Sequence, residues 1–294
     1  MHATRGAEAA RAVALALALA GAACGGASPP ASSDPPPAAG GDFFESGGAR
    51  LHYVIDLPPG TGPFPGVVIG HGAGAVGTGD GAFYVPFLRA RGFAVLRYDK
   101  RGVGQSTGTY RGVSAANSVA QVEELGGDLA AAALFLSRRP GVDGGRVGLM
   151  GTSQAGWIMV AAAARTPVVR FTIAVTGSVE PVGVNIAYEN LREMPIDEAY
   201  AGLAAFGGAP GYDPVPTLAA RATPSLWLLG AQDRLVPTRA CVTVLDGLKS
   251  RGAPVSYVVY PGTGHNLPGA DYWPAIDDFL RASGNGSSQP ALLR

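Results

Sequence analysis

The sequence is poor in charge, and the charges that it has are balanced. Charged residues make up 15% of the 294 positions, and 22 acidic side chains offset 22 lysines and arginines. Without net charge the chain has no long-range field that would draw it to nucleic acid. We therefore expect no nucleic-acid partner, and the sequence gives no indication of a protein partner.

Cysteine and histidine are scarce as well, with two and four copies. Cys24 follows an apolar N-terminal segment and Cys241 lies in a predicted helix, so no internal disulfide is expected. The histidines are scattered, and no cluster of cysteine or carboxylate side chains has the spacing of metal ligands. We expect neither a bound metal nor a cofactor.

Long hydrophobic runs are missing, and the longest indicates a signal peptide. Arg5 and Arg11 precede an uninterrupted small and apolar run at 12–23. At about twelve residues this run is too short to span a bilayer, but it suits the apolar region of a secretory signal. We interpret residues 1–23 as a signal peptide and expect an exported protein.

The residues just before Cys24 resemble the lipobox of bacterial lipoproteins, although Gly21 stands where leucine is usual. The resemblance implies a lipid on Cys24 that holds the protein at a membrane surface of the cell envelope. An ordinary signal peptide, cleaved near Ala23 or Ala27, is the alternative, and the protein would then be periplasmic or secreted.

Composition divides the rest of the chain. Residues 24–41 are rich in proline, glycine and serine, without apolar periodicity, and predict a disordered linker. Residues 42–283 are expected to form one domain, and 284–294 a disordered tail. Within the domain, residues 178–223 interrupt the regular pattern and are interpreted as a short lid, whose aromatic side chains, Tyr188 among them, suggest a modest apolar substrate group.

Short apolar runs alternate with helical segments along the domain. The expected strands are 49–57, 66–70, 93–98, 147–150, 171–176, 225–229 and 255–260. The expected helices are 83–91, 119–138, a segment from 155, 185–194, 197–206, 238–251 and 272–281. This alternation predicts an α/β fold with a mostly parallel, doubly wound sheet, whose ligands bind at the carboxyl ends of the strands.

Ser153 has the sequence context of a nucleophile, between an apolar strand and an Ala-rich helix. A serine on such a tight turn is held clear of the sheet, in the field of the helix N-terminus. His265 follows the strand 255–260 in a Gly-rich loop and is the candidate base. Asp233 follows the strand 225–229 and is the candidate acceptor for the imidazole.

The order Ser, Asp, His, each after a separate strand, resembles the α/β-hydrolase fold. Matching segments are His-Gly-Ala-Gly at 71–74, Asp-Lys-Arg-Gly-Val-Gly at 99–104, Gly-Thr-Ser-Gln-Ala-Gly at 151–156, Gly-Ala-Gln-Asp at 230–233 and Gly-Thr-Gly-His at 262–265. The chain is similar to small bacterial esterases near the dienelactone hydrolases and acyl-thioester hydrolases. The resemblance implies an oxyanion hole at the amides of Ala73 and Gln154, and bracing roles for Asp99 and Arg101. The sequence departs from the family pattern at Ala155, where glycine is usual.

The sequence thus predicts an exported serine hydrolase that cleaves a small-molecule carboxylic ester through an acyl-enzyme. Thioester or peptide cleavage and acyl transfer are alternatives on the same residues. A lipoprotein that binds without catalysis is an alternative of another class. Gly72 to Gly77 also matches the Gly-x-Gly-x-x-Gly pattern of dinucleotide-binding proteins, but the glycines continue into a loop where that motif requires a helix.

Overall fold

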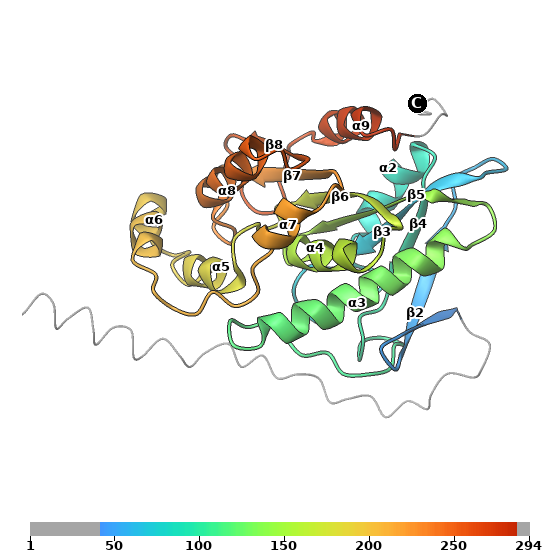
Figure 1. Ribbon diagram of the computed structural model, residues 1–294, viewed down its shortest axis with the longest axis horizontal. Coiled ribbons are helices and arrows are strands. Elements are labelled where there is room, and N and C mark those ends of the chain that lie inside the picture. The colour runs from blue at the N-terminus through green and yellow to red at the C-terminus, as the bar shows by residue number, and fades with distance from the viewer. Residues whose placement is uncertain (1–41, 287–294) are drawn as a thin grey trace, which may run out of the picture. The chain divides into compact units, whose positions relative to one another are not determined.

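The computed structural model describes residues 42–286 (Figure 1). The predicted signal peptide, linker and lipidated Cys24, and the tail from residue 287 onward, lie outside the described residues. None of the helices within 42–286 is long and apolar enough to cross a bilayer.

An eight-stranded sheet forms the centre of the domain, with the order β1-β2-β4-β3-β5-β6-β7-β8. Its strands are β1 (Phe43–Ser46), β2 (Ala49–Asp56), β3 (Phe64–Gly70), β4 (Ala94–Tyr98), β5 (Val142–Thr152), β6 (Val169–Val175), β7 (Ser225–Gly230) and β8 (Val255–Tyr260). β2 pairs with β1 and β4 in antiparallel fashion, and every pairing from β4 through β8 is parallel. The mostly parallel sheet of the prediction is confirmed.

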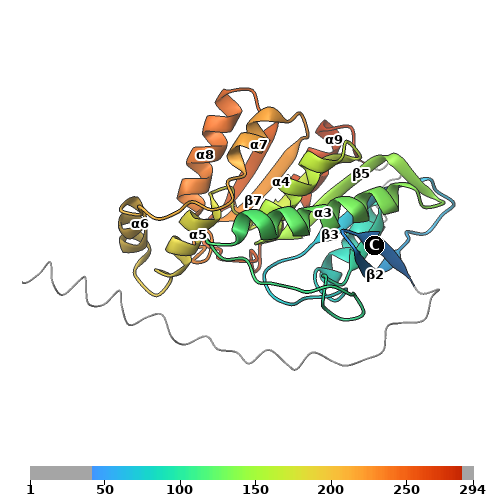
Figure 2. The same cartoon turned by 60° about the horizontal axis from the view of Figure 1, so that its bottom comes forward.

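Helices cover both faces of the sheet, as the uniformly apolar central strands require. They are η1 (Ala82–Tyr84), α2 (Val85–Ala90), α3 (Ser118–Ser137), α4 (Ala155–Arg165), α5 (Val182–Glu189), α6 (Ile196–Ala204), α7 (Val215–Ala220), α8 (Thr238–Ser250) and α9 (Trp273–Ala282). One core cluster joins the sheet to α3, α4 and α8, and a second joins its other face to α2 and α9. Figures 1 and 2 show α5 and α6 together at one end of the domain.

Two elements escaped the sequence prediction. β1 is only four residues long and follows the expected linker directly, so it offers too short a pattern to recognise. α7 lies in the part of the expected lid for which no helix was predicted, but Pro214 and Pro216 stand at its start, where the missing N–H of proline costs no helical hydrogen bond.

Arg101 braces the segment after β4 against α3. Its guanidinium donates to both carboxylate oxygens of Asp128, at 2.7 and 2.6 Å, and to Glu124 at 2.6 Å. Arg101 is 7% exposed and Asp128 is fully buried. The guanidinium therefore neutralises a carboxylate that water does not reach, in agreement with a structural role.

Arg101→Met is expected to lower the free energy of unfolding by about 3–5 kcal/mol, because it leaves the buried Asp128 carboxylate without its partner. Urea denaturation of the purified variant measures the change. Arg281→Met is the matched control, since Arg281 pairs with Asp278 at the surface and both side chains are 74% exposed. The control is expected to change stability by less than about 1 kcal/mol. Equal losses in both variants would contradict the bracing role.

Candidate active site

Ser153 occupies a strained turn between β5 and α4. Its φ is 58°, in the left-handed region that residues other than glycine rarely adopt. The backbone N–H of Ser153 donates to Val175 O at 3.0 Å, which ties the turn to the end of β6. This is the geometry of a nucleophile elbow, with the serine held at the carboxyl edge of the sheet.

Ala155 shows how the elbow accommodates its departure from the usual glycine. The residue is fully buried. A Cβ on Gly151 would lie 2.6 Å from the Ala155 methyl and 2.5 Å from Gly70 O, so glycine at 151 is required where alanine stands at 155. A Cβ on Gly70 would be 3.4 Å from the same methyl. The extra methyl therefore fits because its neighbours on β3 and β5 carry no side chain.

Asp233 and His265, which are 32 positions apart, meet at the same edge of the sheet. Asp233 Oδ2 lies 2.8 Å from His265 Nδ1, and the aspartate is 1% exposed. Its other oxygen accepts the N–H groups of Leu235 and Val236, at 2.8 and 2.9 Å. The carboxylate is thus fixed by its own loop, and it fixes the imidazole in turn.

The sheet brings Ser153 to the same edge as this pair. Ser153 follows β5, Asp233 follows β7 and His265 follows β8, and these strands run parallel. Within residues 42–286 no hydrogen bond joins the Ser153 hydroxyl to the imidazole, whose contact is with Asp233. Catalytic hydrogen bonds are often long before substrate binds, so this arrangement is compatible with a base that closes onto the serine.

The amides of Ala73 and Gln154, predicted to form an oxyanion hole, donate to no acceptor within residues 42–286. The amides on both sides of Ala73, in contrast, are engaged. Gly72 N–H donates to Asp80 Oδ2 at 3.1 Å, and Gly74 N–H donates to Tyr110 Oη at 3.2 Å. Two unpartnered donors therefore remain in the two loops that the sequence singled out.

A cavity of about 250 Å³ opens beside Ser153. Ala73, Ser153 and Gln154 lie in its wall, together with one face of α5. The other lining residues are Val113, Trp157, Ser178, Val182, Asn185, Ile186, Glu189, Leu235 and Val236. Its walls are mainly apolar, which suits a substrate group of modest size.

The residues of α5 that line this cavity were not among the predicted site residues. The spacing of Val182, Asn185, Ile186 and Glu189 is that of one helical face and could have revealed them. The predicted helix began too late to include the first of them. Tyr188, one of the lid aromatics from which an apolar substrate group was inferred, is fully buried, and its hydroxyl donates to Asp233 O at 2.9 Å.

The remaining histidines have structural partners. His71 is buried, and its Nε2 lies 2.7 Å from Tyr98 O. Burial lowers the pKa of His71 to about 3, so the ring is neutral at physiological pH. His52 Nδ1 lies 2.9 Å from Asp99 Oδ2. None of the three histidines within 42–286, His265 included, lines the cavity beside Ser153, so His265 is distinguished by its contact with Asp233.

The loop at 72–77 is not followed by the helix that a dinucleotide-binding motif requires. After Gly72 the chain runs as a loop to η1, a single three-residue turn that begins at Ala82. No helix N-terminus therefore faces the glycines at the point where a pyrophosphate would bind. Within 42–286 no three histidine, cysteine or carboxylate side chains are grouped closely enough to hold a metal ion.

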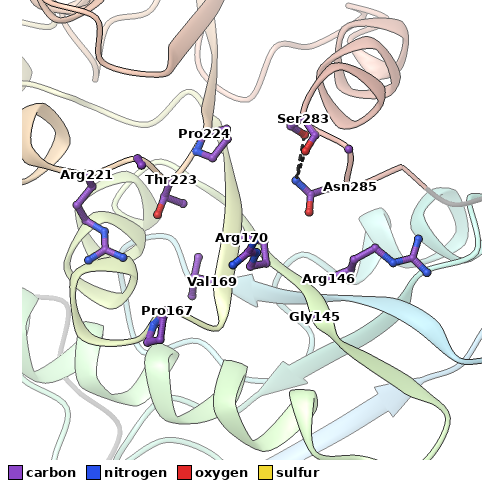
Figure 3. Close-up of a pocket in the computed structure, with 12 residues that line it drawn as sticks. Gly145, Arg146, Pro167, Val169, Arg170, Arg221, Thr223, Pro224, Ser283 and Asn285 are labelled. Carbon is purple, nitrogen blue, oxygen red and sulfur yellow. Dashed lines mark hydrogen bonds between the residues drawn. The ribbon is translucent and has the colours of Figure 1, made fainter.

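A second, more open hollow of about 520 Å³ lies at the amino ends of β6 and β7 (Figure 3). Arg146, Arg170 and Arg221 line it, and Arg146 also pairs with Asp143. It contains none of the predicted site residues and lies at the sheet edge opposite to Ser153. The predicted site residues Ala73, Ser153 and Gln154 instead line the smaller cavity.

Known proteins share this fold and the region that holds the site. The esterase of Pyrococcus furiosus superposes with a TM-score of 0.62 at 16% identity, covering 82% of this chain and 89% of that one. For acetyl xylan esterase 1 from Thermoanaerobacterium sp. JW/SL YS485 the TM-score is 0.58 at 21% identity, with 80% of each chain covered. These likenesses show the α/β-hydrolase fold.

Sequence comparison gives the family. The peroxisomal succinyl-coenzyme A thioesterase of Mus musculus is 26% identical over 240 residues, which are 74% of this chain and 52% of that protein, so the chain spans about half of its length. The family model described as "Prolyl oligopeptidase family" matches residues 82–277, the stretch that contains Ser153, Asp233 and His265. The chain therefore belongs to the prolyl oligopeptidase family and has the α/β-hydrolase fold of the serine hydrolases.

Proposed function

We propose that the protein is a serine hydrolase that cleaves small-molecule carboxylic esters, with Ser153 as nucleophile, His265 as base and Asp233 as the residue that orients the imidazole. The observation that carries this proposal is the contact of 2.8 Å between the buried Asp233 carboxylate and His265, at the sheet edge that holds the Ser153 turn. An aspartate on Nδ1 leaves the other ring nitrogen, Nε2, to accept a proton.

The reaction follows from these positions. Ser153 Oγ attacks the ester carbonyl while its proton passes to His265 Nε2, and the N–H groups of Ala73 and Gln154 receive the oxyanion. The carbon–oxygen bond to the alcohol then breaks, and the alcohol leaves with the proton from His265. Water, deprotonated by the same imidazole, attacks the acyl-enzyme, and the carboxylic acid departs as Ser153 regains its proton.

Labelling with a fluorophosphonate tests the nucleophile. Folded wild-type protein should gain the probe on Ser153, and the peptide that carries it can be identified by mass spectrometry. The absence of labelling in folded protein would favour the non-catalytic binding module. A panel of p-nitrophenyl esters of increasing acyl length would then measure how large an acyl group the cavity of about 250 Å³ admits.

Thioester cleavage is the second candidate, because a relative that aligns with 74% of this chain is a succinyl-coenzyme A thioesterase. Ester and thioester pass through similar tetrahedral intermediates, so the same residues would serve both. Comparing kcat/KM for an ethyl ester and an N-acetylcysteamine thioester of the same acid separates the two. We expect the ester to be preferred, and a thioester preferred by more than tenfold would reverse the assignment.

We further propose that the protein is exported and tethered to a membrane surface through a lipid on Cys24. The signal-like run at 12–23 and the small residues before Cys24 support this. In a bacterial host, full-length wild-type protein should sediment with membranes, and Cys24→Ser should move to the soluble fraction of the envelope. Cys241→Ser is the matched control, because Cys241 is fully buried in the domain. Equal membrane binding of both variants would contradict the tether.

A further inference from the structure

Lys100 is a buried cation without a carboxylate in direct contact. It follows β4, and only 1% of its surface is exposed. Its ammonium donates to Gly72 O at 2.6 Å and to Gly74 O at 2.9 Å, and lies 4.8 Å from the centre of the Tyr110 ring. Burying a charge is costly, and no salt bridge of Lys100 lies within the described residues to offset the cost.

The two carbonyls bracket Ala73. We propose that Lys100 is a positioning residue that aims the Ala73 N–H at the developing oxyanion by holding the carbonyl of the preceding residue. This inference rests on the proposed hydrolase function and extends it to a residue outside the triad. Lys100 touches neither the cavity wall nor the proposed reacting atoms, so its effect passes through the backbone.

The geometry of the peptide unit carries the argument. Gly72 O and Ala73 N–H belong to one peptide plane, and the only cis peptide among the described residues is Gly62-Pro63. In a trans peptide the C=O and N–H bonds point in opposite directions. Because the ammonium holds the carbonyl on one side, the Ala73 N–H faces the other side, where it has no acceptor within residues 42–286.

The loop would not keep this orientation without help. Gly72 and Gly74 flank Ala73, and the φ of Gly74 is 96°, so the loop has wide conformational freedom. Rotation of a single peptide plane would present a carbonyl to the oxyanion in place of a donor. The positively charged ammonium that donates to the carbonyl also polarises the peptide and strengthens its N–H as a donor. Both effects act on the transition state, where the negative charge develops.

The environment of the ammonium makes its charge sensitive to pH. Burial lowers the pKa of Lys100 to about 8, and the Asp80 carboxylate acts in the opposite direction. The other titratable groups facing it are Tyr110, whose pKa burial raises, and His71, whose pKa is lowered to about 3. The ammonium therefore loses its proton near pH 8, while His71 stays neutral through that range.

Lys100→Met tests the proposal, since methionine matches the length of the stem and removes the charge and its donors. We expect kcat to fall about 10- to 100-fold with KM changed less than threefold, because one oxyanion donor is worth about 10²- to 10³-fold and it is misdirected rather than deleted. A trifluoromethyl ketone analogue of the best ester gives the specific readout. Ser153 Oγ adds to its carbonyl carbon, the proton passes to His265, and the former carbonyl oxygen becomes the oxyanion.

The inhibition constant of this ketone should rise by the same factor as kcat/KM falls, because both report on the oxyanion. Lys249→Met is the matched control, since Lys249 is the only other lysine in the sequence and is exposed on α8. Tyr110→Phe is a second control, because it removes a neutral bond to Gly74 without releasing the Gly72 carbonyl. Each control should change kcat by less than threefold.

The outcomes separate this inference from the function on which it rests. A wild-type protein without Ser153-dependent hydrolysis overturns both. If the wild type is active and folded K100M has the wild-type kcat and the wild-type inhibition constant for the ketone, the positioning role alone is overturned. The same holds if K100M is less stable than the wild type but keeps both of these constants.

A second variant covers the case in which K100M does not fold. Lys100→Gln keeps an uncharged N–H donor, and it should lower kcat less than K100M. Wild-type kcat should fall severalfold as the pH rises through about 8, whereas K100Q should lack this step. The same step in both proteins, or a K100Q that keeps the wild-type kcat at pH 7, overturns the proposal.

Discussion

Ser153→Ala is expected to lower kcat for ester hydrolysis by about 10⁶-fold, which is the loss when the nucleophile of a serine triad is removed. Without Oγ no acyl-enzyme forms, and water must attack the ester directly. The amides of Ala73 and Gln154 remain, so a residual acceleration of about 10³-fold over the uncatalysed reaction should persist. Stopped assays with highly purified protein measure this remaining activity.

Two control measurements distinguish the loss of the nucleophile from a loss of folded protein. Ser250→Ala, at the exposed end of α8, should retain full activity. Ser153→Ala should unfold at nearly the wild-type temperature, because alanine adopts the φ of 58° about as poorly as serine does. Ser153→Gly should be more stable by about 1 kcal/mol, since glycine relieves that strain. A variant at 153 that stays folded and keeps even a hundredth of the wild-type kcat would refute its role as nucleophile.

The elements that carry the site were predictable from local patterns. The runs 66–70, 225–229 and 255–260 are mostly apolar, and they became β3 and β7 in the interior of the sheet and β8 at its edge. Because a parallel sheet gathers the carboxyl ends of its strands at one edge, the positions of Ser153, Asp233 and His265 followed from the strand assignment. The contact between Asp233 and His265 was thereby anticipated, although they are far apart in the sequence.

What the sequence did not reveal depends on which side of an element packs against its neighbours. Lys100 follows a strand in a loop, where a lysine is ordinarily solvated, and only the tertiary structure buries it beneath the turn at 72–74. In the same way, α5 begins three residues earlier than predicted, so Val182, the first of its cavity-lining residues, was assigned to a loop. Local propensity places an element, but the packing decides which of its residues reach the site.

Asp233→Asn is expected to lower kcat by about 10⁴-fold with little change in KM, as the loss of the carboxylate does in serine triads. The asparagine Oδ1 can still accept the N–H groups of Leu235 and Val236, so its loop should keep its shape. The amide nitrogen then faces His265 Nδ1 and donates a hydrogen bond to it. That contact moves the imidazole proton to Nε2, and the ring can no longer accept the proton of Ser153.

The matched control is Asp246→Asn, because Asp246 is an exposed aspartate on α8 that accepts a hydrogen bond of 2.7 Å from Tyr257. It should keep wild-type kcat and KM, and D233N should unfold close to the wild-type temperature because the substitution preserves volume. Fluorophosphonate labelling of D233N should slow in parallel with kcat, since both reactions need His265 to remove the serine proton. If D233N retained kcat within tenfold of the wild type, the imidazole would be oriented by another group, and the buried Asp233 contact would be structural.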